Sequence, residues 1–416
     1  MVQQFQNYIP LLDALKDEKR HAIILLLAQH KSGLNVNTIA EYIQLSRPAI
    51  SHHLKVLRQA GFVDYNKRKV LSMKAMVIEK YGKSVPLLLK ERPMPVLGEY
   101  DVLVDIRAAS LNPIDYKIKS GKLKLLLDYE MPLILGNDFS GVVIKAGDKV
   151  DPFKPGDEVY GRPRKNRIGT LAEYIAVHQD DISLKPKNLS FEEAASIPLV
   201  GLTAYQAFHD ILKLQKGEKI LIHAGSGGVG TFAIQLAKSM GAYVATTVSE
   251  KGCDLVKSLG ADQIINYRKD DFEQLLKEYD AVLDTLGGDV LKKSFHVLKP
   301  GGKIVSVSGL PNAKFGKEAR LERWKTILLS LVSHKLTGLE KKTQTSYHFL
   351  FMKPDGAQLK KIKELMEQQR IIPVIDRVFK FAEAPQALEY LEGGRAKGKV
   401  VVSISPHPWS SNANAL

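Results

Sequence analysis

The chain has 416 residues, 44% hydrophobic and 25% charged, a composition typical of a globular protein with two or three domains. No apolar run approaches the roughly 20 residues that span a bilayer, and the first residues resemble neither a signal peptide nor a transit peptide. The single cysteine, Cys253, excludes intrachain disulfides and multi-cysteine metal sites. We therefore expect a cytoplasmic protein with no membrane partner.

The net charge of +15 is unevenly distributed. Residues 1–72 contain ten Lys or Arg against five Asp or Glu, and the other 344 residues contain fifty against forty. The basic excess per residue is thus more than twice as dense at the N-terminus. This indicates a polyanion partner there or a solubilising surface, and charge alone does not separate the two.

Residues 8–60 have the pattern of helices only. We predict one helix over Leu11–Gln29, a short one from Asn37 or Thr38 to Ile43, and a third that Ser46 caps and that runs to Ala60. Gly61 ends the third helix. A helix, a turn and a Ser-capped helix form an arrangement that places a helix N-terminus in the major groove of DNA.

The segment Asn37–Tyr65 resembles the winged helix-turn-helix of arsenic-repressor-like regulators, with a shortened wing over Phe62–Val70. The third helix has an apolar face, and its other faces carry the side chains that we expect to contact double-stranded DNA within residues 37–70: Ser46, Arg47, Ser51, His52, Lys55 and Arg58. The family's cysteine pair and dimerisation helix are missing. The alternatives are a helical module that packs without touching DNA, or a fused passenger.

From Met73 the pattern changes to alternating strands, turns and helices. Strands are predicted at Lys74–Ile78, Asp101–Ile106 and Gly141–Ile144. Further on, the apolar run Lys219–Ile222 is followed by the loop His223–Gly230.

The loop His223–Gly230 carries glycines at the G-x-G-x-x-G positions, and a helix follows it at Thr231–Lys238. Glycine permits the tight turn and lets the backbone approach a pyrophosphate at the helix N-terminus. Strand, loop and helix together predict a dinucleotide site with the cofactor-binding residues Gly225, Gly227, Gly228, Val229 and Gly230.

The end of the next predicted strand, Ala242–Val248, lacks the acidic residue that binds the ribose hydroxyls of NAD. In its place stand groups able to hold a 2′-phosphate: Ser249, Lys251, Tyr267 and Arg268. NADP(H) is therefore predicted as the cofactor.

Six further motifs, in order and spacing, resemble the medium-chain dehydrogenase/reductase superfamily from Met73 to about Ile404: Asn112–Lys117, Gly136–Gly141, Phe153–Gly161, Ala194–Pro198, Gly201–Tyr205 and Gly398–Val402. The resemblance implies an α/β fold in which a doubly wound Rossmann sheet is inserted in a GroES-like, β-rich catalytic domain. With the N-terminal helical, winged-helix module at 1–72, the implied domains are the catalytic domain at 73–198 and 351–405 and the Rossmann domain at 199–350. A flexible tail follows at 406–416.

The same resemblance indicates whether a catalytic zinc ion is expected. Asn112 stands where the alcohol dehydrogenase branch has its first zinc-binding cysteine, and Asn137 stands where it has the histidine. Amides are poor zinc ligands, so we expect no metal and an activated acceptor in place of an alcohol. The chain resembles quinone oxidoreductases and, more closely, NADPH-dependent alkenal/enone reductases.

The resemblance also implies functional residues. Lys117 is the first candidate for a catalytic group near the substrate oxygen and Tyr116 the second, although Lys117 is equally compatible with a cofactor contact or with solvent. Thr203 is implied to contact the nicotinamide, and the Ser308–Gly309 backbone its carboxamide.

Three points stay open. The reductase fold is an enzyme, or it senses NADP(H) or an electrophile for a DNA-binding regulator. The resemblance to the medium-chain dehydrogenase/reductase superfamily, whose members commonly form dimers, favours a homodimer. We expect Cys253 to be a packing residue, and we expect the basic segment 313–342, with eight Lys or Arg against three Glu, to be a surface helix, although a lid or a dimer contact would also fit.

Overall fold

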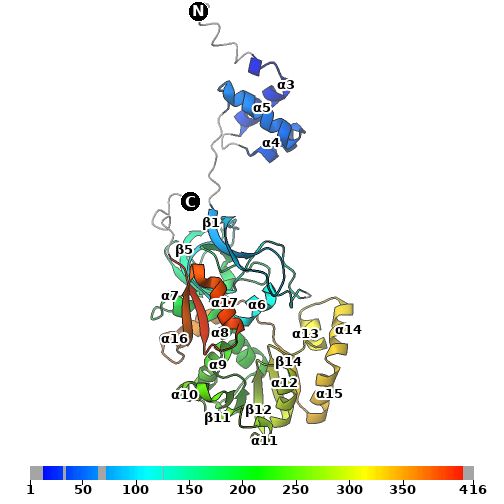
Figure 1. Cartoon of the computed structure of the whole chain (residues 1–416), viewed down its shortest axis with the longest axis vertical. Helices are drawn as coiled ribbons and strands as arrows, with labels where there is room; N and C mark the ends of the chain where they lie inside the picture. The colour runs from blue at the N-terminus through cyan, green and yellow to red at the C-terminus, as the bar shows by residue number, and fades with distance from the viewer. Residues whose placement is uncertain (1–12, 31–33, 64–71, 125, 406–416) are drawn as a thin grey trace, which may run out of the picture. The chain divides into compact units, whose positions relative to one another are not determined.

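A computed structural model describes residues 13–30, 34–63, 72–124 and 126–405 of the chain (Figure 1). The chain divides into two compact units, one over Met1–Leu71 and the other over Ser72–Leu416. Each unit is described by itself below.

The first unit contains the helices α3 (Glu18–Gln29), α4 (Val36–Ile43) and α5 (Arg47–Gln59), and residues 13–14 before them are also helical. Each helix begins after a residue whose side-chain oxygen accepts from first-turn N–H groups, namely Asp17, Asn35 and Ser46. The single helix predicted over Leu11–Gln29 is interrupted: residues 13–14 are helical, the chain turns at residues 15–16, and the Asp17 cap starts α3, while Leu11 itself lies outside the described residues.

The core of this unit is small and apolar. The inward face of α5 buries Ile50, Leu54 and Leu57 against Ile23 of α3 and Ile39 of α4. Spacings of three and four residues put the α5 side chains on one face, as the sequence indicates. Most of the predicted wing, from residue 64 on, lies outside the described residues.

The β-rich part of the second unit holds two sheets. A three-stranded antiparallel sheet has the order β2 (Leu88–Pro93), β1 (Ser72–Ile78), β4 (Leu133–Ile134). The second sheet has seven strands. Six of them follow the order β15 (Ile375–Lys380), β16 (Lys399–Ser403), β3 (Asp101–Leu111), β5 (Asp138–Ala146), β6 (Glu158–Gly161), β8 (Ile182–Leu184). The seventh, β7 (Tyr174–His178), pairs with β3, which also pairs with β5.

The third sheet is fully parallel and six-stranded. Its order is β11 (Gln263–Asn266), β10 (Tyr243–Val248), β9 (Lys219–Ile222), β12 (Tyr279–Asp284), β13 (Leu298–Ser306), β14 (Ser346–Phe349). In chain order this is 3-2-1-4-5-6, the Rossmann arrangement, whose ligand crevice lies at the carboxyl ends of the strands where the order reverses. The predicted fold class is confirmed. Figure 1 shows this sheet and the β-rich part at opposite ends of the second unit.

Helices connect and cover these sheets. Those of the β-rich part and of the passage between the two parts are α6 (Pro113–Lys119), α7 (Phe191–Ala195), α8 (Pro198–Tyr205) with a π-helical continuation over Gln206–Leu212, α16 (Gly356–Glu367) and α17 (Ala384–Glu392). Those of the Rossmann part are α9 (Gly228–Ser239), α10 (Cys253–Ser258), α11 (Phe272–Leu275) and α12 (Gly288–Ser294). Short 3-10 turns lie at Gln179–Asp181, Glu250–Gly252, Phe295–Val297 and Phe381–Glu383.

Two contacts far apart in sequence join the parts of the second unit. Tyr160 of β6 is buried and donates its hydroxyl to the Leu359 carbonyl of α16 at 2.7 Å. Gly398, just before β16, pairs with Gly227 of the glycine loop and donates to the Ser226 carbonyl at 2.8 Å. The last strand of the β-rich part is thus attached to the nucleotide loop.

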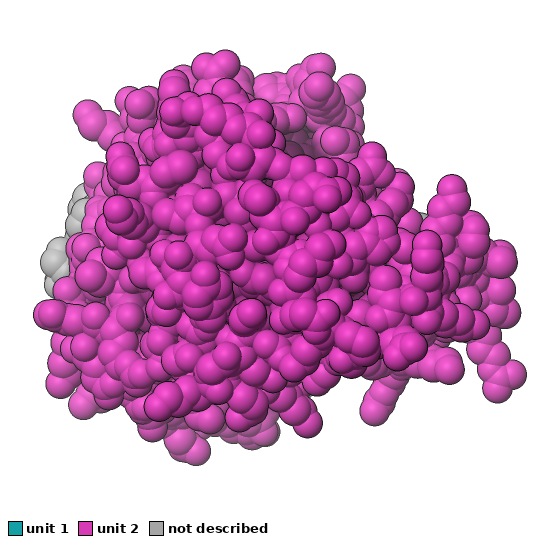
Figure 2. Space-filling model, turned by 90° about the horizontal axis from the view of Figure 1, so that it is seen from below, with its two compact units in different colours: residues 1–71 teal, residues 72–416 magenta. Residues whose placement is uncertain are grey.

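The basic segment 313–342 contains three helices where the sequence analysis expected one: α13 (Ala313–Glu318), α14 (Arg323–Val332) and α15 (His334–Thr343). Leu336 of α15 is buried with the Rossmann core, whereas α14 buries no residue. Figure 2 shows that the second unit extends to one side, the side on which α14 and α15 lie in Figure 1.

Candidate active site

The glycine loop lies between β9 and α9 as predicted. Gly227 is the N-cap of α9 and supplies no side-chain oxygen, so no side chain caps the first-turn N–H groups. Such a helix start, at the carboxyl end of the first strand, is a ready anion site.

The glycines of the loop differ in how much room a side chain would have at each position. A Cβ on Gly225 would lie 2.1 Å from the Thr246 Oγ1, and one on Gly230 would lie 2.4 Å from the Ala224 carbonyl oxygen, so both allow strand and helix to approach closely. At Gly227 the nearest atom would be the Ala224 oxygen at 3.3 Å, and its φ of −81° is open to any residue. The backbone at Gly227 is therefore less crowded than at Gly225 and Gly230, which suits the close approach of a pyrophosphate.

His223, the first residue of the loop, is structural. Its ring nitrogens contact the Thr247 Oγ1 at 3.0 Å and the Ser294 Oγ at 2.8 Å, and the side chain is buried. Burial lowers the pKa of His223 to about 4, so the ring is neutral near pH 7.

The residues predicted to bind a 2′-phosphate follow the ends of two adjacent strands. Val248 of β10 pairs with Asn266 of β11, so Ser249 and Tyr267 leave the sheet side by side. Lys251, Tyr267 and Arg268 are exposed. Glu250, which lies between Ser249 and Lys251, forms an ion pair with Lys269 at 3.1 Å.

Thr203 and the Ser308–Gly309 backbone are more constrained than the sequence analysis expected. The Thr203 Oγ1 donates to the Leu199 carbonyl one turn earlier in α8, at 2.7 Å. The N–H groups of Ser308 and Gly309 donate to the Ser306 Oγ at 3.2 and 2.7 Å. Since both backbone N–H groups are used in this way, the backbone of Ser308 and Gly309 can offer a ligand only its carbonyl groups.

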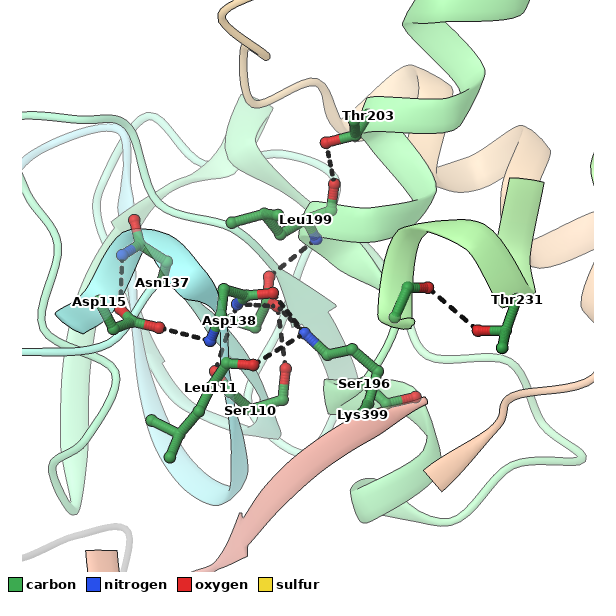
Figure 3. A network of polar contacts seen from close by, with 12 residues as sticks. Ser110, Leu111, Asp115, Asn137, Asp138, Ser196, Leu199, Thr203, Thr231 and Lys399 are labelled. Atoms are coloured by element: carbon green, nitrogen blue, oxygen red, sulfur yellow. Dashed lines mark hydrogen bonds and ion pairs between the residues drawn. The ribbon is translucent and has the colours of Figure 1, made fainter. Parts of the chain in front are cut away.

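The two asparagines at the expected zinc positions are bound into a buried polar network (Figure 3). The Asn112 Nδ2 donates to the Asp138 Oδ2 at 2.8 Å, and the Asn137 Nδ2 donates to the Asp115 Oδ1 at 2.8 Å. The Asn112 backbone N–H donates to the Asp115 Oδ2 at 2.7 Å. Both amides therefore donate to buried carboxylates and help to satisfy their hydrogen-bonding capacity.

A lysine supplies the positive charge of this network. The Lys399 ammonium donates to the Leu111 carbonyl at 3.2 Å, to the Asp138 Oδ2 at 3.3 Å and to the Asn112 Oδ1. These three acceptors match the three donors of an ammonium group, so none is left for a ligand. Burial lowers the pKa of Lys399, and the charge of Asp138 opposes that shift.

Asp138 also reaches the Rossmann part. Its Oδ1 accepts from the backbone N–H of Leu199 at 2.8 Å, in the first turn of α8. A small pocket opens nearby, between the starts of α8 and α9, and is lined by Ser196, Ile197, Val200, Gly228, Thr231, Phe232, Ile372, Pro373, Val374 and Lys399. The network thus lies next to the glycine loop.

Two further buried ionisable groups flank Asn137. Burial raises the pKa of Asp115 to about 6, against the hydrogen bonds from Asn137 and Asn112, which favour the ionised carboxylate. Arg162 is also buried, donates from Nη2 to the Asn137 Oδ1 at 3.4 Å, and has no hydrogen-bond partner for its Nε among the described residues.

The catalytic candidates Lys117 and Tyr116 lie on α6, which begins at Asn112 and so starts from the network. Lys117 is half-buried, and burial together with the charge of Lys122 lowers its pKa. Tyr116 packs against the core of the β-rich part, where burial and the charge of Glu392 raise the pKa of its phenol.

Sequence reasoning missed Lys399, Asp138, Asp115 and Arg162. Lys399, Asp138 and Asp115 fall inside three of the family-like motifs, Gly398–Val402, Gly136–Gly141 and Asn112–Lys117, which was the available signal. Within the described part of the chain, no three His, Cys, Asp or Glu side chains are grouped to hold a metal ion. Cys253 packs against the Rossmann core, and its Sγ contacts the Ser249 carbonyl at 3.7 Å.

The second unit has relatives among known proteins. Residues 98–187 match the alcohol dehydrogenase GroES-like domain, and residues 259–402 match the zinc-binding dehydrogenase family. The chain is 36% identical over 359 residues to the zebrafish (Danio rerio) mitochondrial NAD(P)H oxidoreductase RTN4IP1, covering 80% of this chain and 91% of the relative. It is 37% identical over 345 residues to the tomato (Solanum lycopersicum) 2-methylene-furan-3-one reductase, covering 80% of each.

A solved structure agrees with these relatives. The quinone oxidoreductase from Coxiella burnetii superposes with a TM-score of 0.70 at 35% identity, over 80% of this chain and all of that one. The fold and the site are those of a nicotinamide-dependent oxidoreductase. The chain belongs to the medium-chain dehydrogenase/reductase superfamily, as its motifs predicted, and it is an enzyme.

The N-terminal unit has its own family match: residues 17–65 match bacterial regulatory proteins of the arsR family. This confirms the predicted resemblance. None of the helices described has the length and apolarity of a transmembrane span.

The Gly227→Asp substitution tests the glycine loop. Because only one atom would lie within 4 Å of a Gly227 Cβ and its φ is ordinary, a shift of a few tenths of an ångström should let the fold accept the change, while the carboxylate repels the cofactor phosphates. We expect the dissociation constant for NADPH, measured by fluorescence titration, to rise by about tenfold or more. Gly227→Asn is the matched control and should have a smaller effect; equal effects would mean that bulk, and not charge, is responsible.

Proposed function

We propose that this enzyme is an NADPH-dependent, zinc-independent reductase that transfers hydride to a quinone or an α,β-unsaturated carbonyl. The observation that carries the proposal is the network at the expected zinc position. There the amides of Asn112 and Asn137 are bound to carboxylates, and the Lys399 ammonium supplies the cation. The names of the relatives, which include reductases of enones and quinones, support the same acceptor class.

The preference for NADPH rests on charge. The site offers the hydroxyl of Ser249 and the cations of Lys251 and Arg268 at the ends of β10 and β11, and the nearby Glu250 is neutralised by Lys269. A dianionic 2′-phosphate is stabilised by such donors, whereas ribose hydroxyls alone gain little from them.

A bound NADPH would supply the hydride. A quinone takes up this hydride and one proton to become a hydroquinone; an enone takes the hydride at its β-carbon and a proton at its α-carbon. The role of this chain is then to orient the acceptor, polarise its oxygen and deliver the proton. We assign the proton to Lys117, whose half-buried ammonium has a lowered pKa, with Tyr116 as the second candidate.

A substrate panel tests the function. Purified full-length protein should oxidise NADPH in the presence of small quinones or alkenals, with a higher kcat/KM than for NADH, as followed by absorbance. EDTA should leave the rate unchanged, because no step uses a metal. Inactivity with both acceptor classes would refute the proposal, and loss of activity in EDTA would refute its zinc-free part.

Lys117 is tested by its pH profile. If its ammonium donates the proton, the rate is full below the pKa of Lys117 and falls as pH rises through that pKa, which lies below the ordinary lysine value. Lys117→Met should lower kcat by roughly 10²-fold and remove this alkaline limb, while Lys117→Arg moves the limb upward. A variant that raises only the KM for NADPH would instead identify Lys117 as a cofactor contact.

We propose DNA binding as a second activity, carried by the N-terminal unit. The observation that favours it is the outer surface of α5, where all six predicted contact residues are exposed: Ser46, Arg47, Ser51, His52, Lys55 and Arg58. The match to arsR-family regulators supports it as well. A homodimer, which the family's habit suggests, would present two such helices to two half-sites.

The double substitution Arg47→Ala and Lys55→Ala should weaken binding to DNA from upstream of its own gene in a mobility-shift assay. We expect the slope of log K against log salt to fall by about 2, one for each lost phosphate contact. Lys19→Ala, an exposed lysine on α3, is the control and should have little effect. If the intact protein shifts no DNA at low salt, this second activity is refuted.

A further inference from the structure

Helix α14 presents an apolar face to solvent. Five of its ten residues are large, apolar and exposed, with exposed fractions of 42–65%: Trp324, Ile327, Leu328, Leu331 and Val332. Steps of three and four residues align them in one stripe along the helix. A contiguous exposed stripe of this kind marks an interaction surface.

The opposite side of α14 rests on its own neighbours. Gly316 of α13 approaches Thr326 so closely that a Cβ on that glycine would lie 2.8 Å from the Thr326 Oγ1. Ser333, which ends α14, is buried and donates to the Leu329 carbonyl at 2.7 Å. Since one side of the helix is held, the exposed stripe is presented in a fixed orientation, on the side of the unit that extends outward in Figure 2.

The surroundings of the stripe are basic. Two of the three acids in residues 313–342 are paired inside the segment: Glu322 with Lys325 at 3.1 Å and Glu340 with Lys314 at 2.8 Å. Exposed cations remain before and after the stripe, at Lys317, Arg320, Arg323, Lys335, Lys341 and Lys342. An apolar stripe with a tryptophan and flanking cations has the composition of a helix that lies in a membrane interface.

We propose that α14 docks this enzyme on the surface of an anionic lipid bilayer, with Trp324, Ile327 and Leu331 entering the boundary between headgroups and acyl chains. Charge decides between this partner and a second copy of the chain. A twofold contact through α14 would bring two identical basic rims together, whereas anionic headgroups neutralise them. The sequence analysis expected no membrane partner because no apolar run is long enough to span a bilayer. A helix that lies in the membrane interface does not need such a run.

Trp324 provides a direct readout. The chain has two tryptophans, Trp324 and Trp409, so Trp409→Phe leaves Trp324 as the only one. The full-length variant is titrated with vesicles of phosphatidylcholine alone and with vesicles containing about 30% phosphatidylglycerol. We expect a blue shift of the Trp324 emission, and co-sedimentation, with the anionic vesicles only, both weakened by high salt.

A second variant separates α14 from the rest of the basic surface. Ile327→Ser with Leu331→Ser should lower the vesicle partition coefficient by about tenfold or more, because two apolar side chains leave the interface. The matched control, Val96→Ser with Leu275→Ser, removes two exposed apolar side chains elsewhere and should change it little. Turnover with a water-soluble acceptor should stay unchanged in both.

Three outcomes would overturn the proposal. Equal vesicle binding by the parent and the Ile327→Ser/Leu331→Ser variant would assign the binding to another surface, such as the basic N-terminal unit. Unchanged Trp324 emission with anionic vesicles would show that the stripe stays in water. A fall in the sedimentation mass of that variant, without vesicle binding by the parent, would make the stripe a contact between copies of the chain.

Discussion

The Asp138 carboxylate is the group on which the arrangement of the second unit depends. It is fully buried and accepts hydrogen bonds from the end of β3 through Ser110 and Asn112, from β16 through Lys399, and from the first turn of α8 through Leu199. One carboxylate therefore links both ends of the β-rich part to the helix that leads into the Rossmann part. Removing its cation would leave a buried charge unpaired, at a cost of about 3–5 kcal/mol.

This interaction also explains the chemistry that the site favours. In a metal-dependent relative the charge at this position belongs to an ion with an open coordination position, which can polarise an alcohol. Here the charge belongs to an ammonium whose three donors are used within the protein. On the proposed mechanism, electrophilic help for a substrate comes from elsewhere, and Lys117 on α6, the helix that Asn112 caps, is the residue we propose for that role. Acceptors that need little activation fit such a site.

The two proposed surfaces outside the site share one physical basis. Both α5 and α14 have one packed side and one exposed side with cations on it or beside it, and both partners proposed for them are anionic. They differ in what accompanies the charge: α5 presents hydroxyl, imidazole and guanidinium groups that suit base edges and phosphates, whereas α14 presents a tryptophan and aliphatic side chains that suit lipid.

The sequence by itself determined the elements whose signals are local. The Ser46 cap and the glycine loop depend on backbone geometry within a few residues, and both lie where they were predicted. The break in the first predicted helix was missed because the turn at residues 15–16 and the Asp17 cap interrupt an apolar pattern that continues before them. The tertiary structure alone decided the network of Asp115, Asp138 and Lys399 and the exposure of α14. Lys399 lies 287 positions from Asn112 in sequence, and the burial that makes its charge costly without a partner exists only once the sheets have closed around it.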